Sequence, residues 1–170
     1  MVLTLTIFAG GCGPNLKAIP TPLHDPVEQV FEGRIRRIWG GDNFEFGERL
    51  QLHYVLIRGV DTPKPGQDYY NEAREFFTKA VRGQTARVEI CSRDELAREF
   101  ADVFVLPRKE GDVKKDMGLE LIKAGLGWYD GMEFDKAEEF RQAEQEARAS
   151  KIGLWSKENP VPPWEFNGGK

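Results

Sequence analysis

Three β-rich segments between residues 30 and 60, followed directly by a helix, constrain the fold more than any other feature. The segments are VFEGRIRRIW (30–39), a second strand that starts with NFEF (43–46), and RLQLHYVLIRGV (49–60). The turn GGDN (40–43) separates the first two, and Gly47-Glu48 makes a hairpin between the second and third. This spacing predicts a three-stranded meander in the first half of the chain.

The second half alternates helices with two further strands. A helix starts near Asn71 as N-cap and ends at Gly83, and its apolar residues share one face: Ala73, Phe76, Phe77, Ala80 and Val81. Strands are expected over 84–92 and 100–107, with the charged hairpin RDELARE between them, and helices over 115–126 and 135–151. The last helix turns Ala137, Phe140, Ala143 and Ala147 inward. This order predicts a mainly β, α+β domain: a five-stranded OB-type barrel with three α-helices.

The chain divides into four parts by composition. MVLTLTIFAGGC (1–12) resembles the end of a secretory signal with a lipoprotein-type cleavage site, although the basic n-region is missing. A Pro-rich linker (13–28), the folded domain (29–157) and a Pro- and Trp-containing tail (158–170) follow. We expect export, with Cys12 as a lipidation site that anchors the chain to a membrane; the alternatives are a secreted protein, or a short apolar leader or edge strand. Cys91 is then left without a disulfide partner and is expected to be a small buried residue.

The net charge of −4 argues against a strong, sequence-independent grip on nucleic acid, which needs a basic field. A local basic surface remains compatible with that charge. The candidates for weak nucleic-acid contacts are Arg34, Arg36 and Arg37 on the first strand and the stacking pair Trp128-Tyr129. The alternatives are a charged outer face for the arginines and packing at the edge of the core for the aromatic pair.

Polar residues at strand boundaries suggest a site. Asp42 and Asp61 each lie where a strand of the meander begins or ends, so the two carboxylates can lie side by side and bind a hard cation with an oxygen of Thr62. Arg98, in the hairpin, can bind a phosphate with two hydrogen bonds. The alternatives are two turn aspartates and a solvated hairpin arginine. Neither His24 nor His53 has neighbours at zinc spacing.

Several segments, in order, resemble the staphylococcal nuclease (thermonuclease) family. GRIRRIWGGDNFEF is similar to that family's first strand, DGDT turn and second strand, and VLIRGVDTPK to its V-R-L-x-G-I-D-x-P-E segment. RDELAREFADVFV resembles its D-x-Y-G-R-x-L-A hairpin, LELIKAGLGWY its L-V-x-x-G-x-A helix end, and AEQEARASKIGLW its A-E-x-x-A-R…G-L-W signature. NPVPPWEF resembles the ending of bacterial members. The resemblance covers about Gly33 to Trp164.

The resemblance implies an OB barrel with three helices and descent from calcium-dependent nucleases that hydrolyse DNA and RNA. Members hold calcium with two aspartates and a threonine carbonyl, clamp the phosphate with two arginines, and use a glutamate on the attacking water. By position, Asp42, Asp61 and Thr62 match the calcium ligands, and Arg98 matches one of the phosphate-binding arginines.

Other positions depart from the family pattern. Leu56 stands where the second arginine belongs, and Lys64 where the glutamate belongs. Gly40 and Asn43 replace the first Asp and the Thr of DGDT, and Leu96-Ala97 replace the Tyr-Gly before the hairpin arginine. Loss of a general base typically costs ~10²–10⁴-fold in rate, and loss of a cationic donor ~10²–10³-fold. We therefore expect a binding module with weak or no hydrolysis and with calcium affinity weakened by Lys64.

One alternative keeps the chain an active calcium-dependent endonuclease. Arg58 lies two residues after Leu56 and can swing back to the lost arginine's place, while Asp68, Glu72 or Glu99 supplies a carboxylate. A second hypothesis pairs Lys64 directly with Asp61, so that the ammonium fills the metal position. We expect a monomer, with nucleic acid or an unidentified protein as its partner.

Overall fold

The computed structural model describes residues 26–48, 51–109 and 111–167. Its strands are β1 (Gln29–Gly33), β2 (Ile35–Ile38), β3 (Asn43–Glu48), β4 (Gln51–Ile57), β5 (Val60–Asp61), β6 (Ala86–Arg93), β7 (Glu99–Val105), β8 (Lys115–Asp116) and β9 (Trp128–Tyr129). Its helices are α1 (Tyr70–Val81), α2 (Met117–Lys123), α3 (Ala137–Ala149) and the 3₁₀ helix η1 (Gly153–Ser156). Cys12 and the leader, together with most of the linker, lie outside the described residues.

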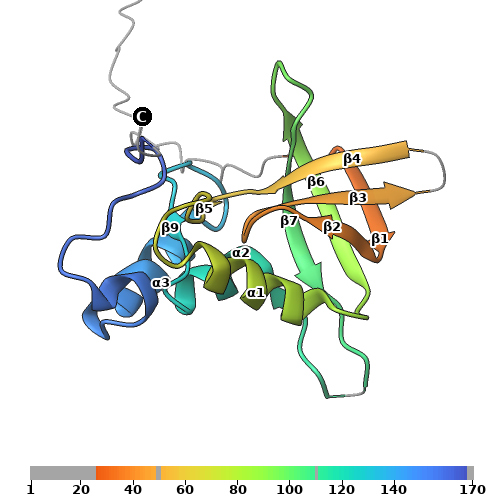
Figure 1. Cartoon of the computed structure of the whole chain (residues 1–170). Helices are drawn as coiled ribbons and strands as arrows, with labels where there is room; N and C mark the ends of the chain where they lie inside the picture. Colours follow the sequence, from red (N-terminus) through yellow and green to blue (C-terminus); the bar gives the residue numbers. More distant parts are fainter. Residues whose placement is uncertain (1–25, 49–50, 110, 168–170) are drawn as a thin grey trace, which may run out of the picture.

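The strands form a mixed sheet curved into a half-barrel (Figure 1). The order is β1-β6-β7-β4-β3-β2, with β8 paired to β7, and β5 and β9 form a separate two-stranded sheet. β2, β3 and β4 are antiparallel neighbours, which confirms the predicted meander. β4 and β7 run parallel and join the meander to the second half of the sheet. The predicted OB-like α+β fold with three α-helices is confirmed.

The strand count differs from the predicted five because two predicted strands are interrupted and because two short strands, β8 and β9, were not predicted. The first changes partner at Arg34, so that β1 pairs with β6 while β2 pairs with β3. The third is interrupted at Gly59, whose φ of 77° ends β4 and lets β5 pair with β9 instead. The first interruption places β1 and β2 at opposite ends of the curved sheet, and the second passes the chain from that sheet to the separate β5–β9 pair.

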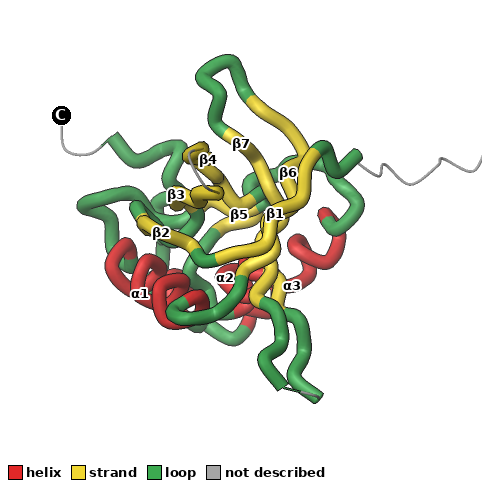
Figure 2. The backbone as a smooth tube through the Cα atoms, turned by 90° about the vertical axis from the view of Figure 1, so that its right-hand side faces the viewer, coloured by secondary structure: helices red, strands yellow, loops and turns green. Residues whose placement is uncertain are grey.

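The three α-helices lie together on one side of the strands, as the red segments of Figure 2 show. α1 buries Ala73, Phe77 and Val81, as its apolar pattern predicts, and the Phe77 ring lies 5.4 Å from that of Phe44 on β3. α2 starts later than predicted because residues 115–116 pair with β7. The Asp116 carboxylate then caps α2 by accepting hydrogen bonds from Gly118 N and Leu119 N. Within the described residues, no helix has the length and apolarity to cross a membrane.

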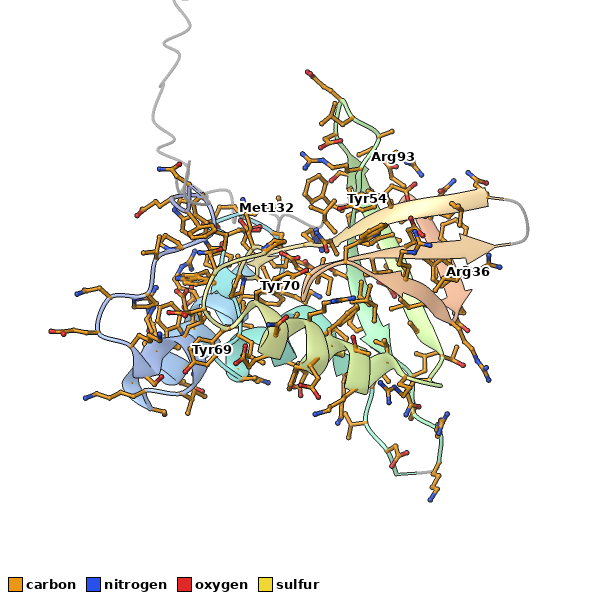
Figure 3. All side chains as sticks on the ribbon, in the orientation of Figure 1. Arg36, Tyr54, Tyr69, Tyr70, Arg93 and Met132 are labelled. Atoms are coloured by element: carbon orange, nitrogen blue, oxygen red, sulfur yellow. The ribbon has the colours of Figure 1, made fainter. Side chains whose placement is uncertain are left out.

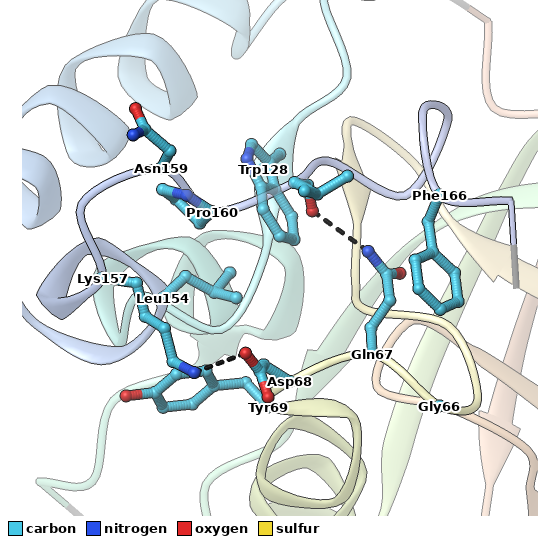
Figure 4. Close-up of a pocket in the computed structure, with 11 residues that line it drawn as sticks. Gly66, Gln67, Asp68, Tyr69, Trp128, Leu154, Lys157, Asn159, Pro160 and Phe166 are labelled. Carbon is cyan, nitrogen blue, oxygen red and sulfur yellow. Dashed lines mark hydrogen bonds and ion pairs between the residues drawn. The ribbon is translucent and has the colours of Figure 1, made fainter. Parts of the chain in front are cut away.

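The C-terminal tail returns across the loop that follows β5 (Figure 4). The Trp164 ring lies 6.5 Å from that of Trp128, and Gln67 Nε2 donates a hydrogen bond to Val161 O at 3.0 Å. Lys157 forms an ion pair with Asp68 of the same loop. The tail therefore contacts the segment that leads from Asp61 into α1.

Candidate functional site

A cavity of about 500 Å³ opens where the 39–43 turn, the β4–β5 segment and the start of the β6–β7 hairpin meet. Its charged lining residues are Asp42, Asp61, Lys64, Arg98 and Asp130. The structure thus brings together the predicted calcium residues, the predicted phosphate-binding arginine and Lys64. Leu56 and Thr62 also line this cavity, which we call the site cavity.

Main-chain hydrogen bonds hold the two aspartate segments side by side. Ile57 N, at the end of β4, donates to Asp42 O at 2.7 Å. Asp42 Oδ2 accepts a hydrogen bond from Thr62 N at 2.9 Å. Gly41 allows this approach, because a Cβ there would lie 2.9 Å from Thr62 Cγ2. The turn before β3 and the end of β5 are therefore one structural unit.

The surroundings of the two carboxylates disfavour their charged forms. Burial raises the pKa of Asp42 to about 6, although the hydrogen bond from the Thr62 backbone opposes this and the charge of Asp61 adds to it. Burial also raises the pKa of Asp61, whereas the charge of Lys64 lowers it and that of Asp130 raises it. A bound cation would relieve this accumulation of negative charge.

The oxygens around Asp42 fit a hard cation such as calcium. Thr62 Oγ1 and Asn43 Oδ1 are buried and have no hydrogen-bond partner among the described residues. Together with Asp42 and Asp61 they supply carboxylate and neutral oxygens, the donor types that calcium takes. The described part of the chain holds no group of three or more His, Cys, Asp or Glu side chains with metal-binding geometry. A cation at this site would therefore be bound by two carboxylates together with neutral oxygens.

Arg98 stands at the cavity with its guanidinium oriented by a neighbour. Its Nε donates to Asp94 Oδ2 at 2.6 Å, and its backbone N donates to Asp94 Oδ1 at 2.9 Å. The Arg98 side chain remains 44% exposed, which leaves it accessible to a phosphate. Lys64 is exposed on the same cavity wall. No ion pair joins Lys64 to Asp61 among the described residues, so the structure does not support the hypothesis of direct pairing.

Arg58 lies away from the site cavity. Its side chain is 3% exposed, and its Nε and Nη2 donate to the two carboxylate oxygens of Asp102 at 3.0 and 2.9 Å. Nη2 also lies 3.3 Å from Asp135 Oδ1, and the Phe134 ring covers the guanidinium at 4.6 Å. The swing back toward Leu56, on which the active-endonuclease alternative depends, would break these buried interactions of the guanidinium with Asp102.

The three carboxylates proposed to replace the glutamate are also elsewhere. Glu99 is buried and accepts hydrogen bonds from His53 and Arg93. Asp68 pairs with Lys157, and Glu72 is exposed on α1. None of the three lines the site cavity. Side chains alternate in direction along a strand. Glu99, the first residue of β7, therefore points into the barrel, whereas its neighbour Arg98 lines the cavity.

Asp130 is a site residue that the sequence analysis missed. It follows β9, whose pairing with β5 brings the two segments together, and its backbone N donates to Gly59 O at 3.4 Å. Partial desolvation raises the pKa of Asp130, and hydrogen bonds from the Met132 and Gly59 backbones oppose this. The β5–β9 pair joins residues almost 70 positions apart, and no local sequence pattern signals it.

The predicted nucleic-acid residues do not form one surface. Trp128 is 3% exposed and packs on Trp155 at 5.6 Å, in agreement with the packing alternative. Tyr129 is half-buried, and its hydroxyl donates to Met132 O. The three arginines of the first strand are exposed: Arg34, Arg36 and Arg37. Only Arg37 reaches the site cavity's rim, where its guanidinium lies 5.1 Å from the Trp39 ring.

Arg36 lies over the β3–β4 hairpin, since a Cβ at Gly47 would meet its Nε at 3.1 Å. Figure 3 shows Arg36 toward that end of the sheet, apart from Tyr70 at the start of α1.

Cys91 is buried and is a free thiol, and its Sγ donates to Glu89 O at 3.3 Å. Its pKa is raised by burial and by the charge of Asp102.

Comparison with known proteins agrees with the family resemblance. The family model of the staphylococcal nuclease homologue matches residues 54–157. The chain is 29% identical over 133 residues to an uncharacterized endonuclease of Escherichia coli O157:H7, covering 78% of this chain and 82% of that protein. It is 29% identical over 116 residues to the staphylococcal-like nuclease CAN1 of Arabidopsis thaliana, covering 68% of this chain and 33% of the relative.

An uncharacterized 38.1 kDa protein of Capnoides sempervirens is 30% identical over 135 residues, or 79% of this chain and 37% of that protein. The chain thus spans about a third of the length of these two plant relatives. The matched region contains the end of β4 (54–57), β5, the β6–β7 hairpin and all three α-helices, and so most of the residues that line the site cavity; the 39–43 turn lies before it. The chain belongs to the staphylococcal nuclease homologue family.

Proposed function

We propose that this chain binds nucleic-acid phosphates at the site cavity with calcium, and hydrolyses them weakly or not at all. The observation that carries the proposal is Lys64, an exposed side chain on the cavity wall at the position where the family resemblance places a glutamate. A protonated amine cannot accept a proton from water, so it cannot act as the general base. It can, however, attract a phosphate.

The surroundings of Leu56 support the same proposal. Leu56 lines the cavity where the resemblance places a phosphate-clamping arginine, and it offers no hydrogen-bond donor. Arg58 is held by Asp102 in the interior. Arg98 is then the one arginine that lines the site cavity among the described residues. A single arginine and a lysine suit binding of a phosphate better than stabilisation of the charge that develops during hydrolysis.

Calcium would be held by Asp42, Asp61 and Thr62, with Asn43 Oδ1 as a further donor. The cation supplies positive charge that offsets the carboxylates and allows an anionic phosphate to approach. This chain's own residues then divide the remaining work. Arg98 and Lys64, which both line the cavity, attract the phosphate, and Asp94 orients the Arg98 guanidinium.

A second candidate function is residual calcium-dependent hydrolysis. It rests on Asp130, a carboxylate at the cavity whose pKa is raised above the usual range. A raised pKa makes a carboxylate a better general base near neutral pH. Under this alternative Asp130→Asn abolishes cleavage, whereas under the main proposal the substitution leaves an already slow rate unchanged.

Digestion of single-stranded DNA with and without calcium tests the proposal. We compare the wild type with Leu56→Arg/Lys64→Glu, which restores both family residues, and expect cleavage to rise by ~10²-fold or more in the restored variant. Leu52→Arg/Lys109→Glu is the matched control, because it makes the same two changes at exposed positions outside the cavity. Calcium-dependent cleavage by the wild type at the rate of the restored variant would overturn the proposal.

A further inference from the structure

One end of the molecule carries a concentration of exposed basic side chains, in a chain whose net charge is −4. They come from the end of α1 with the turn after it (79–83) and from the segment that connects β7 to β8 (106–115). These two segments hold six basic and two acidic residues. The six basic side chains are all exposed: Lys79, Arg82, Arg108, Lys109, Lys114 and Lys115. We call these six side chains the basic end.

The β7–β8 connection projects from the sheet and is joined to the end of α1. Figures 1 and 2 show it extending from the end of the sheet that lies opposite the β6–β7 hairpin, the hairpin that carries Arg98. Leu106 N donates to Thr85 O at 3.0 Å, and the Arg108 guanidinium donates to Gly83 O. The two segments therefore present one surface, and a partner bound there leaves the site cavity open.

Most of the positive charge of the basic end is not neutralised within the protein. Among the described residues, Lys79 is the one member that forms an ion pair, with Glu75 at 2.7 Å. Of the two acidic residues in these segments, Glu110 lies outside the described residues, and the Asp112 carboxylate accepts a hydrogen bond from Lys109 N at 3.2 Å. Unpaired charges of one sign on one surface attract a surface of the opposite sign.

An exposed aliphatic side chain lies among the basic ones. Val113 is 77% exposed and lies between Lys109 and Lys114 in the projecting connection. It borders a cavity of about 250 Å³ whose apolar lining includes Ala80 and Leu106. An apolar side chain flanked by lysines suits the boundary between lipid headgroups and acyl chains. The apolar group can enter this boundary while the ammonium groups stay beside the headgroup phosphates.

The composition of the basic end favours a lipid surface over a nucleic acid. Its two segments contain no aromatic residue, so an unpaired base would find no ring on which to stack. The neighbouring Phe104 ring is covered by Lys114 Nζ at 3.5 Å. Clusters of about four to eight Lys and Arg side chains are typical of proteins that bind anionic lipids, and the basic end falls within this range.

We propose that the basic end docks this protein on an anionic lipid surface, with Val113 entering the lipid interface. The headgroup phosphates then neutralise the six basic side chains. Docking in this way requires neither the proposed nucleic-acid binding at the site cavity nor the expected lipidation of Cys12, so it is tested separately from both.

Co-sedimentation of the full chain with lipid vesicles in EDTA tests the inference, since EDTA prevents calcium from bridging the acidic cavity to the lipid. The probes are vesicles of phosphatidylcholine alone and vesicles of equal parts phosphatidylcholine and phosphatidylglycerol. Each Lys or Arg near an anionic surface contributes about fivefold in affinity. We therefore expect a preference of at least ~10-fold for the anionic vesicles, which falls as salt is added. Residues 1–12 carry no charged side chain and should favour neither vesicle, so the ratio of the two affinities isolates the basic end.

Three variants assign the preference to its residues. Lys109→Glu/Lys114→Glu should reduce the ratio by ~10-fold or more, and Val113→Ser should weaken binding to the anionic vesicles by ~3–10-fold. Arg36→Glu/Arg74→Glu is the matched control, because it makes the same change of charge at exposed positions outside the basic end. The control should keep the ratio within about twofold of the wild type, since distant charges are screened by salt.

Equal affinity of the wild type for the two vesicles would overturn the inference, and so would equal losses in the two charge-reversed variants. The inference is also wrong if Lys109→Glu/Lys114→Glu keeps the vesicle preference but binds a thymidine octamer far more weakly than the wild type. The basic end would then serve a nucleic acid instead. Thermal melts show whether the variants fold, and Lys109→Gln/Lys114→Gln, which only removes charge, repeats the test if the glutamates destabilise the protein.

Discussion

Arg58 and Gly59 show how two adjacent residues determine which side chains reach the site. Gly59 has a φ of 77°, and its Cα faces the rings of Phe134 and Phe140. The resulting change of direction lets Arg58 turn inward to Asp102, while Val60 and Asp61 continue toward the cavity. The conformation of one glycine therefore separates a structural arginine from the candidate calcium ligands.

Gly59→Ala should destabilise the protein by about 2–5 kcal/mol. A left-handed backbone costs a non-glycine residue about 1–2 kcal/mol, and overpacking of a buried site costs about 1–3 kcal/mol. The new Cβ would lie 2.6 Å from Phe134 Cζ. Gly131→Ala is the matched control, since Gly131 has a φ of 84° with open space around it, and should lose only the backbone part. Urea unfolding of both variants checks this, and equal losses would show that the phenylalanine contact is unimportant.

Arg58→Met should lower the free energy of unfolding by about 3 kcal/mol, because it takes from the buried Asp102 carboxylate its two hydrogen bonds from the guanidinium and leaves the ion pair with Lys136 Nζ at 2.9 Å. Since Arg58 does not line the site cavity, phosphate affinity should stay within twofold of the wild type when measured below the unfolding transition. Arg98→Met provides the comparison, with the opposite pattern of little destabilisation and a large loss of affinity. Loss of phosphate affinity in a stable Arg58→Met protein would mean that Arg58 serves the site after all.

At the scale of elements, local sequence patterns predicted the fold well and the site only in part. The turn and helix signals around residues 40–48 and 71–83 identified β3, β4 and α1 because these elements are built from nearby residues. The β4–β7 and β5–β9 pairings join distant segments, and they bring Tyr54 to Arg98 and Asp130 to Asp61. Alternation along a strand indicated that Arg58 shares a face with Leu56, but it could not reveal the change of direction at Gly59.

Gln67 connects the C-terminal tail to the site and provides a test at this scale. Its Oε1 accepts a hydrogen bond from Lys64 N at 2.6 Å, and its Nε2 donates to Val161 O (Figure 4). Gln67→Ala should increase amide hydrogen exchange across residues 64–69, because the loop then loses the hydrogen bond to Lys64 N and one of its contacts with the tail. Gln142→Ala, an exposed glutamine on α3, is the control and should leave that exchange unchanged. Unchanged exchange in Gln67→Ala would show that the tail does not hold the loop.

At the scale of the whole molecule, the proposed function predicts that the acidic cavity couples stability to both pH and calcium. A carboxyl whose pKa is higher in the folded protein binds more protons there, so its contribution is greatest at low pH and is lost as the pH rises through the folded value. For Asp42 this stabilisation is lost between about pH 4 and about pH 6, and the pKa of Asp61 is raised in the same direction. Calcium binds the ionised carboxylates and therefore acts in the opposite sense.

In EDTA, lowering the pH from 7 to 5 should raise the contribution of Asp42 to the free energy of unfolding by about 1 kcal/mol, since one pKa unit corresponds to about 1.4 kcal/mol. In calcium, the stabilisation by the metal should be present at pH 7 and should shrink at pH 5. Asp42→Asn should reduce both effects, and Asp112→Asn, on an exposed loop, should reduce neither. Thermal melts at the two pH values measure this, and identical pH dependence in all three proteins would contradict the assignment.

The most direct test of the central claim follows binding and cleavage of one oligonucleotide in the same reaction. Excess wild-type protein is mixed with a labelled single strand in calcium, and the bound fraction and the intact fraction are measured over time. The account predicts a bound strand that stays intact while Leu56→Arg/Lys64→Glu cleaves it ~10²-fold faster or more. A wild type that cleaves the bound strand as fast as that variant would contradict the claim that Lys64 and Leu56 have converted a hydrolytic site into a binding site.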